Sequence, residues 1–156
     1  MHTAFINSPL GIVSIVGDEN GISAISVFSN GSVSETIPIQ LQEAVNQLND
    51  YFAGNRKVFD FKMNPSGTEF QQKVWQELLN IPFGKTISYL DLSKKLGDVK
   101  AIRAVASANG KNPLWIVVPC HRVIGSNGSL TGYAGGLWRK KWLLEHESPN
   151  QQQLLF

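Results

Sequence analysis

The chain has 156 residues and a mass of 17.2 kDa, which suits one ordinary domain or two small ones. Hydrophobic residues make up 42% and charged residues 17%, so it can bury a core and is no disordered tail. Its single cysteine, Cys120, excludes an internal disulfide framework and a thiolate-cluster metal site. With no apolar run near the roughly 20 residues of a membrane span and no secretory signal, we expect a cytoplasmic protein without a membrane partner.

The charge is divided unevenly along the chain. Residues 1–65 carry three basic and six acidic side chains, whereas residues 66–156 carry eleven basic and six acidic ones. A basic C-terminal half favours a polyanionic partner such as nucleic acid. An imbalance of this size is also common by chance, so the charge pattern supports such a partner without deciding it.

Hydrophobic patterning in the first half predicts a small α/β domain. The expected elements are strands over residues 3–7, 10–17, 21–28 and 58–61 and a helix over residues 38–53. Proline and glycine cluster in residues 62–67, where the charge balance also changes sign. We therefore expect one domain over residues 1–65 and a second over residues 66–156.

The second half is expected to be mainly helical. Ser66 to Glu69 matches a capping box in which the Ser66 hydroxyl accepts from the Glu69 amide, so a helix should begin there. Further helices are expected over residues 88–96, 99–108 and 137–146. The two shorter ones, separated by Gly97, suggest a helix-turn-helix. A three-helix bundle with an alanine-rich packing seam explains the same periodicity.

Cys120 is the only thiol in the chain and therefore the only candidate cysteine nucleophile, and His121 follows it directly. A thiolate is the reactive form of cysteine, so neighbouring cationic or proton-accepting groups would have to activate it. A lone cysteine after an apolar run is more often a small buried hydrophobe. Successive side chains in an extended segment also point to opposite sides, so His121 needs a bend at Pro119 or a bridging water to act. Glu145 and Glu147 are both available to orient the imidazole.

Several ordered blocks give the chain a family resemblance. They are Gly67–Gln71 with Val74-Trp75, Ile81–Tyr89, Ala101–Val105, Asn109–Pro113, Val118–Val123 and Thr131–Gly136. Together they resemble the O6-alkylguanine-DNA alkyltransferases, and the match covers residues 67–147 almost without gaps. The resemblance implies a ribonuclease-H-like α/β domain of a small sheet and a helix, followed by a mainly α domain with a winged-helix-like helix-turn-helix.

The resemblance implies DNA repair by direct reversal of damage. Cys120 matches the residue that takes the alkyl group of O6-alkylguanine, and also that of O4-alkylthymine, in a single irreversible turnover. His121 matches the residue that accepts the thiol proton through water, and Glu147, not Glu145, matches the carboxylate that orients it. Tyr89 matches a hydroxyl that donates to the departing guanine. Asn112 matches an asparagine that ties the active-site turn together.

Resemblance also implies how the substrate is reached. A stacked base hides its alkyl carbon, so the damaged nucleotide must rotate out of double-stranded DNA. In the family the second helix of the helix-turn-helix enters the minor groove, and Arg103 matches the arginine that fills the vacated space. The expected DNA contacts are Arg103, Tyr89, Ala104, Asn109, Ser126 and Lys140. The expected substrate pocket is formed by Pro119, Val123, Gly132, Tyr133 and Ala134.

Two departures from the family leave the size of that pocket open. Asn109 stands where some relatives carry a larger apolar residue, and Ala134 stands where some carry serine. Some relatives bind zinc through N-terminal cysteines and histidines, but the first 65 residues hold only His2 and no cysteine. We therefore predict no metal and no cofactor, and we expect a monomer.

Other functions remain as competing hypotheses. A non-reactive protein that binds alkyl lesions would use the same helices, but such relatives replace the cysteine. A helix-turn-helix transcription regulator would need a dimerisation segment or a sensor domain, and the sequence shows neither. A cysteine hydrolase would leave the family-like DNA-binding helix without a purpose.

Overall fold

The structure is a computed structural model that describes residues 1–126, 128, 133 and 135–148. Backbone contacts divide the chain into two compact units, which are described separately here. Unit 1 comprises Met1–Ser66 with Pro113–Val117, and unit 2 comprises Gly67–Asn112 with the chain from Val118 onward. No helix among the described residues is long and apolar enough to cross a membrane. The cytoplasmic location and the domain boundary at residue 65 stay predictions.

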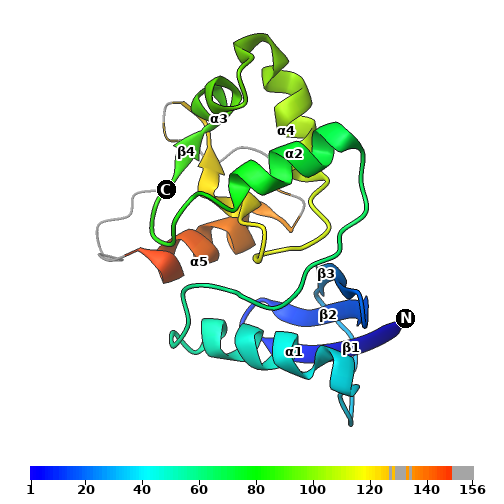
Figure 1. Ribbon diagram of the computed structural model, residues 1–156. Coiled ribbons are helices and arrows are strands. Elements are labelled where there is room, and N and C mark those ends of the chain that lie inside the picture. The colour runs from blue at the N-terminus through cyan, green and yellow to red at the C-terminus, as the bar shows by residue number, and fades with distance from the viewer. Residues whose placement is uncertain (127, 129–132, 134, 149–156) are drawn as a thin grey trace. The chain divides into compact units, whose positions relative to one another are not determined.

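Unit 1 is a three-stranded antiparallel sheet with one helix across a face (Figure 1). Its elements are β1 (His2–Ser8), β2 (Gly11–Asp18), β3 (Gly21–Phe28) and α1 (Ile39–Phe52). Ala4 and Ile6 of β1 are buried and alternate with more exposed neighbours, as expected of a strand with one covered face. Leu41, Val45 and Leu48 recur at helical spacing on α1 and are buried. The three predicted strands and the predicted helix of this region are confirmed.

The strand expected over residues 58–61 is wrong. Phe59 packs against Tyr51 of α1, with ring centres 5.4 Å apart, and Phe61 packs against Phe59, with ring centres 6.0 Å apart. The edge of β3 is instead met just beyond, where the Ile22 amide donates to the Lys62 carbonyl at 2.9 Å and Asn64 donates to Ile22 at 2.7 Å. The apolar pattern of the segment therefore reflects side-chain packing and not a ladder of backbone hydrogen bonds.

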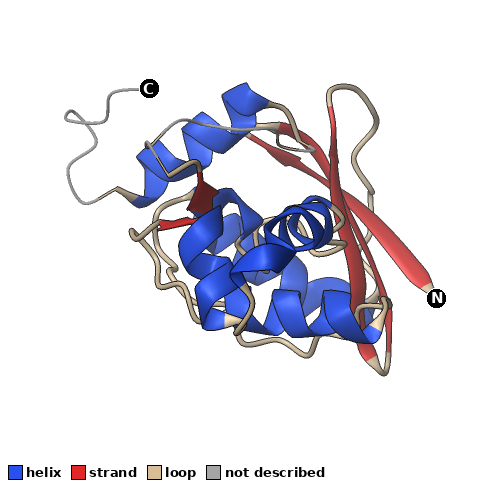
Figure 2. Ribbon diagram, turned by 90° about the horizontal axis from the view of Figure 1, so that it is seen from above, coloured by secondary structure: helices blue, strands red, loops and turns tan. Residues whose placement is uncertain are grey.

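Unit 2 is mainly helical. Its elements are α2 (Glu69–Leu78), β4 (Ile87–Ser88), α3 (Tyr89–Lys95), the 3₁₀ turn η1 (Val99–Ala101), α4 (Ile102–Gly110), the 3₁₀ turn η2 (Cys120–Arg122), β5 (Val123–Ile124) and α5 (Leu137–Glu147). Figure 2, coloured by secondary structure, distinguishes the two short strands here from the long ones of unit 1. β4 and β5 pair in parallel, with Ile87 opposite Val123. This pairing fixes the segment after η2 beside the start of α3.

The helix-turn-helix is formed by α3 and α4, which pack against each other. Gly97 ends the first of these helices with φ +89°, a left-handed conformation that glycine adopts without strain. α4 also packs on α2, where the Trp75 indole donates to the Ala108 carbonyl at 2.9 Å. The small residue at position 108 allows this close approach.

The capping box at the start of α2 lies two residues later than the sequence predicts. Thr68, not Ser66, is the N-cap: its hydroxyl accepts from the Gln71 amide at 3.1 Å, and the Gln71 side chain accepts from the Thr68 amide at 2.9 Å. Gly67 lies so near the Trp75 ring that a Cβ there would come within 2.4 Å of it. The packing of Trp75 therefore requires a residue without a Cβ at position 67.

Substitution of Thr68 tests this cap. Thr68→Ala should lower the free energy of unfolding by about 1 kcal/mol, because the Gln71 amide loses its acceptor. Ser66→Ala is the matched control and should change the stability by less than about 0.5 kcal/mol, since Ser66 is exposed and outside the helix. Urea denaturation followed by circular dichroism measures both. A larger loss for Ser66→Ala than for Thr68→Ala would restore the cap that the sequence predicts.

Candidate active site

Cys120 begins a single turn of 3₁₀ helix. The Cys120 amide donates to the Val118 carbonyl at 2.8 Å, and the Arg122 amide donates to the Pro119 carbonyl at 3.0 Å. The chain therefore bends at Pro119, and the side chains of Cys120, His121 and Arg122 leave it in the directions of a helical turn, not in the alternating directions of a strand. All three are buried, with the cysteine 7% exposed.

A buried carboxylate at the end of α5 joins two residues of this turn. The His121 Nε2 lies 2.8 Å from Glu147 Oε2. The Arg122 guanidinium donates from Nε to Oε1 at 2.7 Å and from a terminal nitrogen to Oε2 at 3.0 Å, a two-pronged ion pair. Its other terminal nitrogen donates to the Ile81 carbonyl at 2.6 Å. Glu145, the alternative carboxylate, is instead partly exposed and lies 3.9 Å from Lys141.

These contacts set the protonation states of the pair. Burial alone would raise the pKa of Glu147, but hydrogen bonds from His121 and Arg122 and the positive charge of Arg122 outweigh it and hold that pKa well below its usual range. Burial lowers the pKa of His121, against the opposing effect of Glu147. A neutral imidazole beside an ionised carboxylate carries its proton on Nε2 and donates it to Glu147. Nδ1, buried and without a hydrogen-bond partner among the described residues, is then left as a proton acceptor.

The surroundings of the Cys120 sulfur both oppose and favour its ionisation. Burial raises the pKa of the Cys120 thiol, while the Asn112 and Tyr133 side chains and the positive charge of Lys140 act to lower it. Asn112 also donates from Nδ2 to the Val118 carbonyl at 2.7 Å, which connects the end of α4 to the segment before the cysteine. Cys120 thus lies among groups that stabilise a thiolate, within a site that is costly for any charge.

The structure places the residues predicted to contact DNA in two different settings. Arg103, Ala104 and Ser126 are exposed. Asn109 is 3% exposed, and its Nδ2 lies 3.4 Å from the Tyr89 hydroxyl and 3.5 Å from the Cys120 carbonyl. Lys140 is 0% exposed. These two side chains are therefore buried in the structure, near the Cys120 site.

The remaining predicted pocket residues are placed only in part. Pro119 and Val123 are buried on either side of η2, and Tyr133 is partly buried. Gly132 and Ala134 lie outside the described residues. Tyr89 is the first residue of α3. The structure thus brings Cys120, Asn112, Tyr133 and Lys140 together, and beside them His121 with Glu147.

Arg122 is the member of the site that the sequence interpretation did not include. It holds η2 in place with two hydrogen bonds to the Glu147 carboxylate and one to the Ile81 carbonyl. The signal was present, since an arginine within an apolar run must find a partner when it is buried. The sequence does not show which of the two nearby carboxylates provides it.

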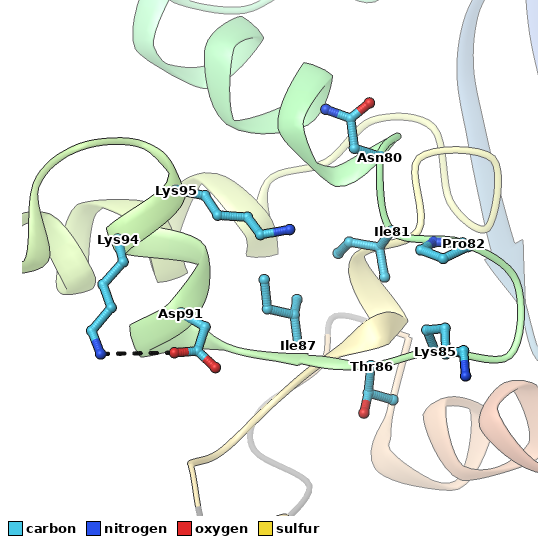
Figure 3. Close-up of a pocket in the computed structure, with 9 residues that line it drawn as sticks. All are labelled: Asn80, Ile81, Pro82, Lys85, Thr86, Ile87, Asp91, Lys94 and Lys95. Atoms are coloured by element: carbon cyan, nitrogen blue, oxygen red, sulfur yellow. Dashed lines mark ion pairs between the residues drawn. The ribbon is translucent and has the colours of Figure 1, made fainter.

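A separate hollow of about 400 Å³ opens between α2, β4 and α3 (Figure 3). Ile81 and Ile87 contribute apolar side chains to it, and Lys85, Lys94 and Lys95 bring positive charge. Lys94 lies 3.9 Å from Asp91, the ion pair drawn there. No thiol or imidazole lines this hollow, so the nucleophilic chemistry of unit 2 is assigned to the Cys120 site.

Comparisons with known proteins identify the family of this chain. Residues 1–65 match the ribonuclease-like domain of 6-O-methylguanine DNA methyltransferase, and residues 69–149 match the DNA-binding domain of the same family. The chain belongs to the 6-O-methylguanine DNA methyltransferase family. The predicted fold, a small sheet and helix followed by a mainly helical domain, is confirmed.

Relatives are similar over nearly their whole length. The methylated-DNA–protein-cysteine methyltransferase of Methanosarcina acetivorans is 46% identical over 154 residues, which cover 94% of this chain and 98% of the relative. The same-named protein of Mycobacterium tuberculosis is 44% identical, with coverages of 94% and 92%. The crystal structure of Mycobacterium tuberculosis OGT in complex with DNA has a TM-score of 0.86 at 43% identity and covers 97% and 98% of the two chains.

Removal of the Glu147 charge tests the buried cluster. Glu147→Gln should lower the free energy of unfolding by about 3 kcal/mol, because it leaves the buried Arg122 guanidinium without its anion. Glu145→Gln is the matched control on the same helix and should change the stability by less than about 0.5 kcal/mol. Urea unfolding at neutral pH measures both, and equal effects would contradict the cluster.

The pH dependence gives the same test a second readout. Because the pKa of Glu147 is lowered by folding, its contribution to stability is complete above its ordinary value of 4.5 and is lost as the pH falls below that value. The lowered pKa of His121 adds a loss of stability as the pH falls below 6.5. The unaltered protein should therefore lose stability from about pH 7 downward, and Glu147→Gln should flatten the acidic part of that curve.

Proposed function

We propose that this protein reverses DNA damage by transferring the methyl group of O6-methylguanine in DNA to the sulfur of Cys120. As a member of its family, the chain is a methylated-DNA–protein-cysteine methyltransferase that binds DNA and repairs O6-methylguanine. The observation that supports Cys120 as the acceptor is its place among Asn112, Tyr133 and Lys140, next to the buried pair of His121 and Glu147.

The transfer is a nucleophilic displacement at the alkyl carbon. The electron pair of the Cys120 thiolate forms the sulfur–carbon bond, and the carbon–oxygen bond breaks with its electrons left on the guanine oxygen. The guanine anion takes up a proton and is restored to the normal base. Since the thioether is stable and the family acts by a single turnover, each protein molecule reacts once.

His121 is proposed to accept the thiol proton through a bridging water. Its Nδ1 is the open acceptor of the ring, because Nε2 is committed to Glu147. A buried polar nitrogen of this kind is a typical site for an ordered water. Glu147, ionised and held by Arg122, keeps the imidazole in the tautomer that can accept a proton.

Residues 66–156 are proposed to form the alkyltransferase and DNA-binding domain. Within it, access to the damaged base is proposed to follow the family pattern. α4 enters the minor groove, the damaged nucleotide rotates out of the duplex, and Arg103 fills the space it leaves. Arg103 and Ala104 are both exposed on α4, which supports this role. Tyr89, at the start of α3, is proposed to donate to the departing guanine. The protein would act as a monomer.

Intact mass measures the proposed acceptor directly. After incubation with duplex DNA that carries O6-methylguanine, the protein should gain the mass of one methylene group, located at Cys120 by peptide mapping. Cys120→Ser should bind the same DNA and remain unmodified. The transfer should stop at one equivalent of DNA per protein, because the thioether is not removed.

Two results would replace this proposal. An unaltered protein that binds the modified duplex tightly yet gains no mass would be a lesion-binding protein. A methyl group found on a residue other than Cys120 would move the acceptor and with it the roles of His121 and Glu147.

Arg103 gives an independent test of base rotation. Arg103→Ala should slow methyl transfer from duplex DNA by about tenfold or more, because unstacking a base costs a few kcal/mol and nothing then fills its place. Transfer from a single-stranded oligonucleotide should change much less, since it has no stack to open. Lys73→Ala, an exposed position on α2, is the control for loss of one positive charge. Equal slowing on both substrates would indicate a simple phosphate contact.

A further inference from the structure

Asn109 is a buried asparagine on the helix that is proposed to enter the minor groove. It lies in the last turn of α4, and its side chain is 3% exposed. Its Nδ2 lies 3.4 Å from the Tyr89 hydroxyl oxygen and 3.5 Å from the Cys120 carbonyl oxygen. One amide nitrogen of α4 therefore contacts both the first residue of α3 and the first residue of η2 within unit 2.

The neighbours of this amide fix its orientation. An amide nitrogen carries two protons and only donates, whereas a carbonyl oxygen only accepts. The atom of Asn109 that faces the Cys120 carbonyl is therefore Nδ2 and not Oδ1, because two oxygens there would repel each other. The Tyr89 oxygen lies near the same nitrogen and so accepts from Asn109. The proton of the Tyr89 hydroxyl is then left for another acceptor.

The stability of the fold does not explain why an asparagine is buried at position 109. Its Oδ1 is buried and has no hydrogen-bond partner among the residues that the structure describes. An unpaired buried oxygen costs free energy. The Cys120 carbonyl also accepts from the Val123 amide, so it would stay paired without Asn109. An apolar side chain of similar size would therefore suit the position at least as well.

We propose that Asn109 is a positioning residue for the transfer, which donates to the Tyr89 oxygen and so directs the Tyr89 proton toward the departing guanine. The inference rests on the proposed function, because it takes Tyr89 as the donor to that base. A hydroxyl whose oxygen already accepts one hydrogen bond has fewer directions left for its proton, so less freedom is lost when the base arrives.

The ring and the hydroxyl of Tyr89 are contacted by different residues. The Lys140 Nζ lies 6.0 Å from the centre of the Tyr89 ring and 5.8 Å from that of the Tyr133 ring. Asn109 contacts the Tyr89 oxygen instead. Both contacts of Asn109 are long for N–H···O bonds, so they orient the hydroxyl more than they stabilise the fold.

A double-mutant cycle tests the coupling between the two residues. Single-turnover methyl transfer from duplex DNA with O6-methylguanine is measured for the unaltered protein, Asn109→Leu, Tyr89→Phe and the double variant. Asn109→Leu should slow the transfer about fivefold, the effect of one ordinary hydrogen bond. Combined with Tyr89→Phe, which leaves no hydroxyl to orient, it should add less than about twofold. Equal slowing with and without Tyr89→Phe would overturn the proposal.

Val105→Ala is the matched control for a disturbance of the same helix. Val105 is buried on α4, and its truncation removes packing but no hydrogen bond. The control should change the transfer rate by the same factor with and without Tyr89→Phe. A coupling to Tyr89→Phe as large as that of Asn109→Leu would show that any loosening of α4 acts on Tyr89, and the proposal would fail.

Further readouts separate this role from three others. A purely structural role would lower the midpoint of urea unfolding in Asn109→Leu, whereas the proposal expects a midpoint that is no lower. A direct DNA contact would weaken DNA binding whether or not Tyr89 keeps its hydroxyl. An effect on the sulfur would slow the reaction of Cys120 with iodoacetamide as much as the methyl transfer, whereas the proposal expects no change. Each of the three results would overturn it.

A measurement with Asn109 in place does not depend on the folding of Asn109→Leu. The side-chain amide signals of Asn109 are followed by nitrogen-15 NMR in the free protein. Tyr89→Phe should shift them, because it removes the oxygen to which Nδ2 donates, and unchanged signals would overturn the proposal.

Failure of the inference is distinguishable from failure of the proposed function. If the unaltered protein gains no methyl group, the proposed function fails. If Tyr89→Phe transfers at the unaltered rate, the proposed role of Tyr89 fails and the inference fails with it. If Tyr89→Phe slows the transfer but shows no coupling to Asn109→Leu, the inference alone is overturned.

Discussion

The carboxylate of Glu147 is the contact on which the site depends. It lies at the last turn of α5 and is bound by two residues of η2, the Arg122 guanidinium and the His121 ring, at distances between 2.7 and 3.0 Å. An ionised group at this depth is tolerated only because both of its oxygens are occupied by strong donors. The same contacts set the tautomer of His121 and fix the helix that carries Lys140. The same contacts of Glu147 therefore neutralise its buried charge and position the side chains of the site.

In the proposed transfer the Cys120 sulfur poses the opposite problem, since its ionised form is needed only briefly. Burial keeps Cys120 protonated, while Asn112, Tyr133 and Lys140 reduce the cost of removing the proton. His121 is the proposed proton acceptor, and because burial lowers its pKa, its ring is neutral near physiological pH. The site thus keeps Cys120 protonated in the free protein and lowers the cost of forming the thiolate during the proposed transfer. The groups that do so lie on different elements of unit 2.

The sequence predicted the parts of the fold that are governed by local patterns. Strands, α1 and the helix-turn-helix followed from hydrophobic period and glycine placement, because those signals lie within a few residues. The strand expected over residues 58–61 failed since its apolar residues pack on Tyr51 of α1, a partner that is distant in sequence. The cap of α2 is Thr68 and not Ser66, because the Gln71 amide and side chain complete a capping box with Thr68.

Prediction of the site shows the same division. The resemblance named Cys120, His121 and Glu147, and the structure places His121 against Glu147, next to Cys120 in η2. The same resemblance put Lys140 among the DNA contacts, whereas its side chain is 0% exposed. Its burial depends on two tyrosines from other segments, and no local pattern reveals that. Arg122 was passed over for the same reason, since its partners, Ile81 and Glu147, lie 41 and 25 residues away.

A protein that reacts once has a particular reason to bury its nucleophile. An exposed, permanently ionised thiolate would react with any electrophile it met, and each such event would consume one molecule without repair. Burial raises the thiol pKa and thereby slows those reactions. The lost reactivity is regained only when a damaged nucleobase occupies the site, where neighbouring groups stabilise the charge that moves during the transfer. A conventional enzyme can regenerate its nucleophile after a stray reaction or a slow step, whereas the Cys120 thioether of the proposed transfer has no such route back. Selectivity before the reaction is therefore worth more here than speed, and a thiol held by opposing effects of burial and charge provides that selectivity.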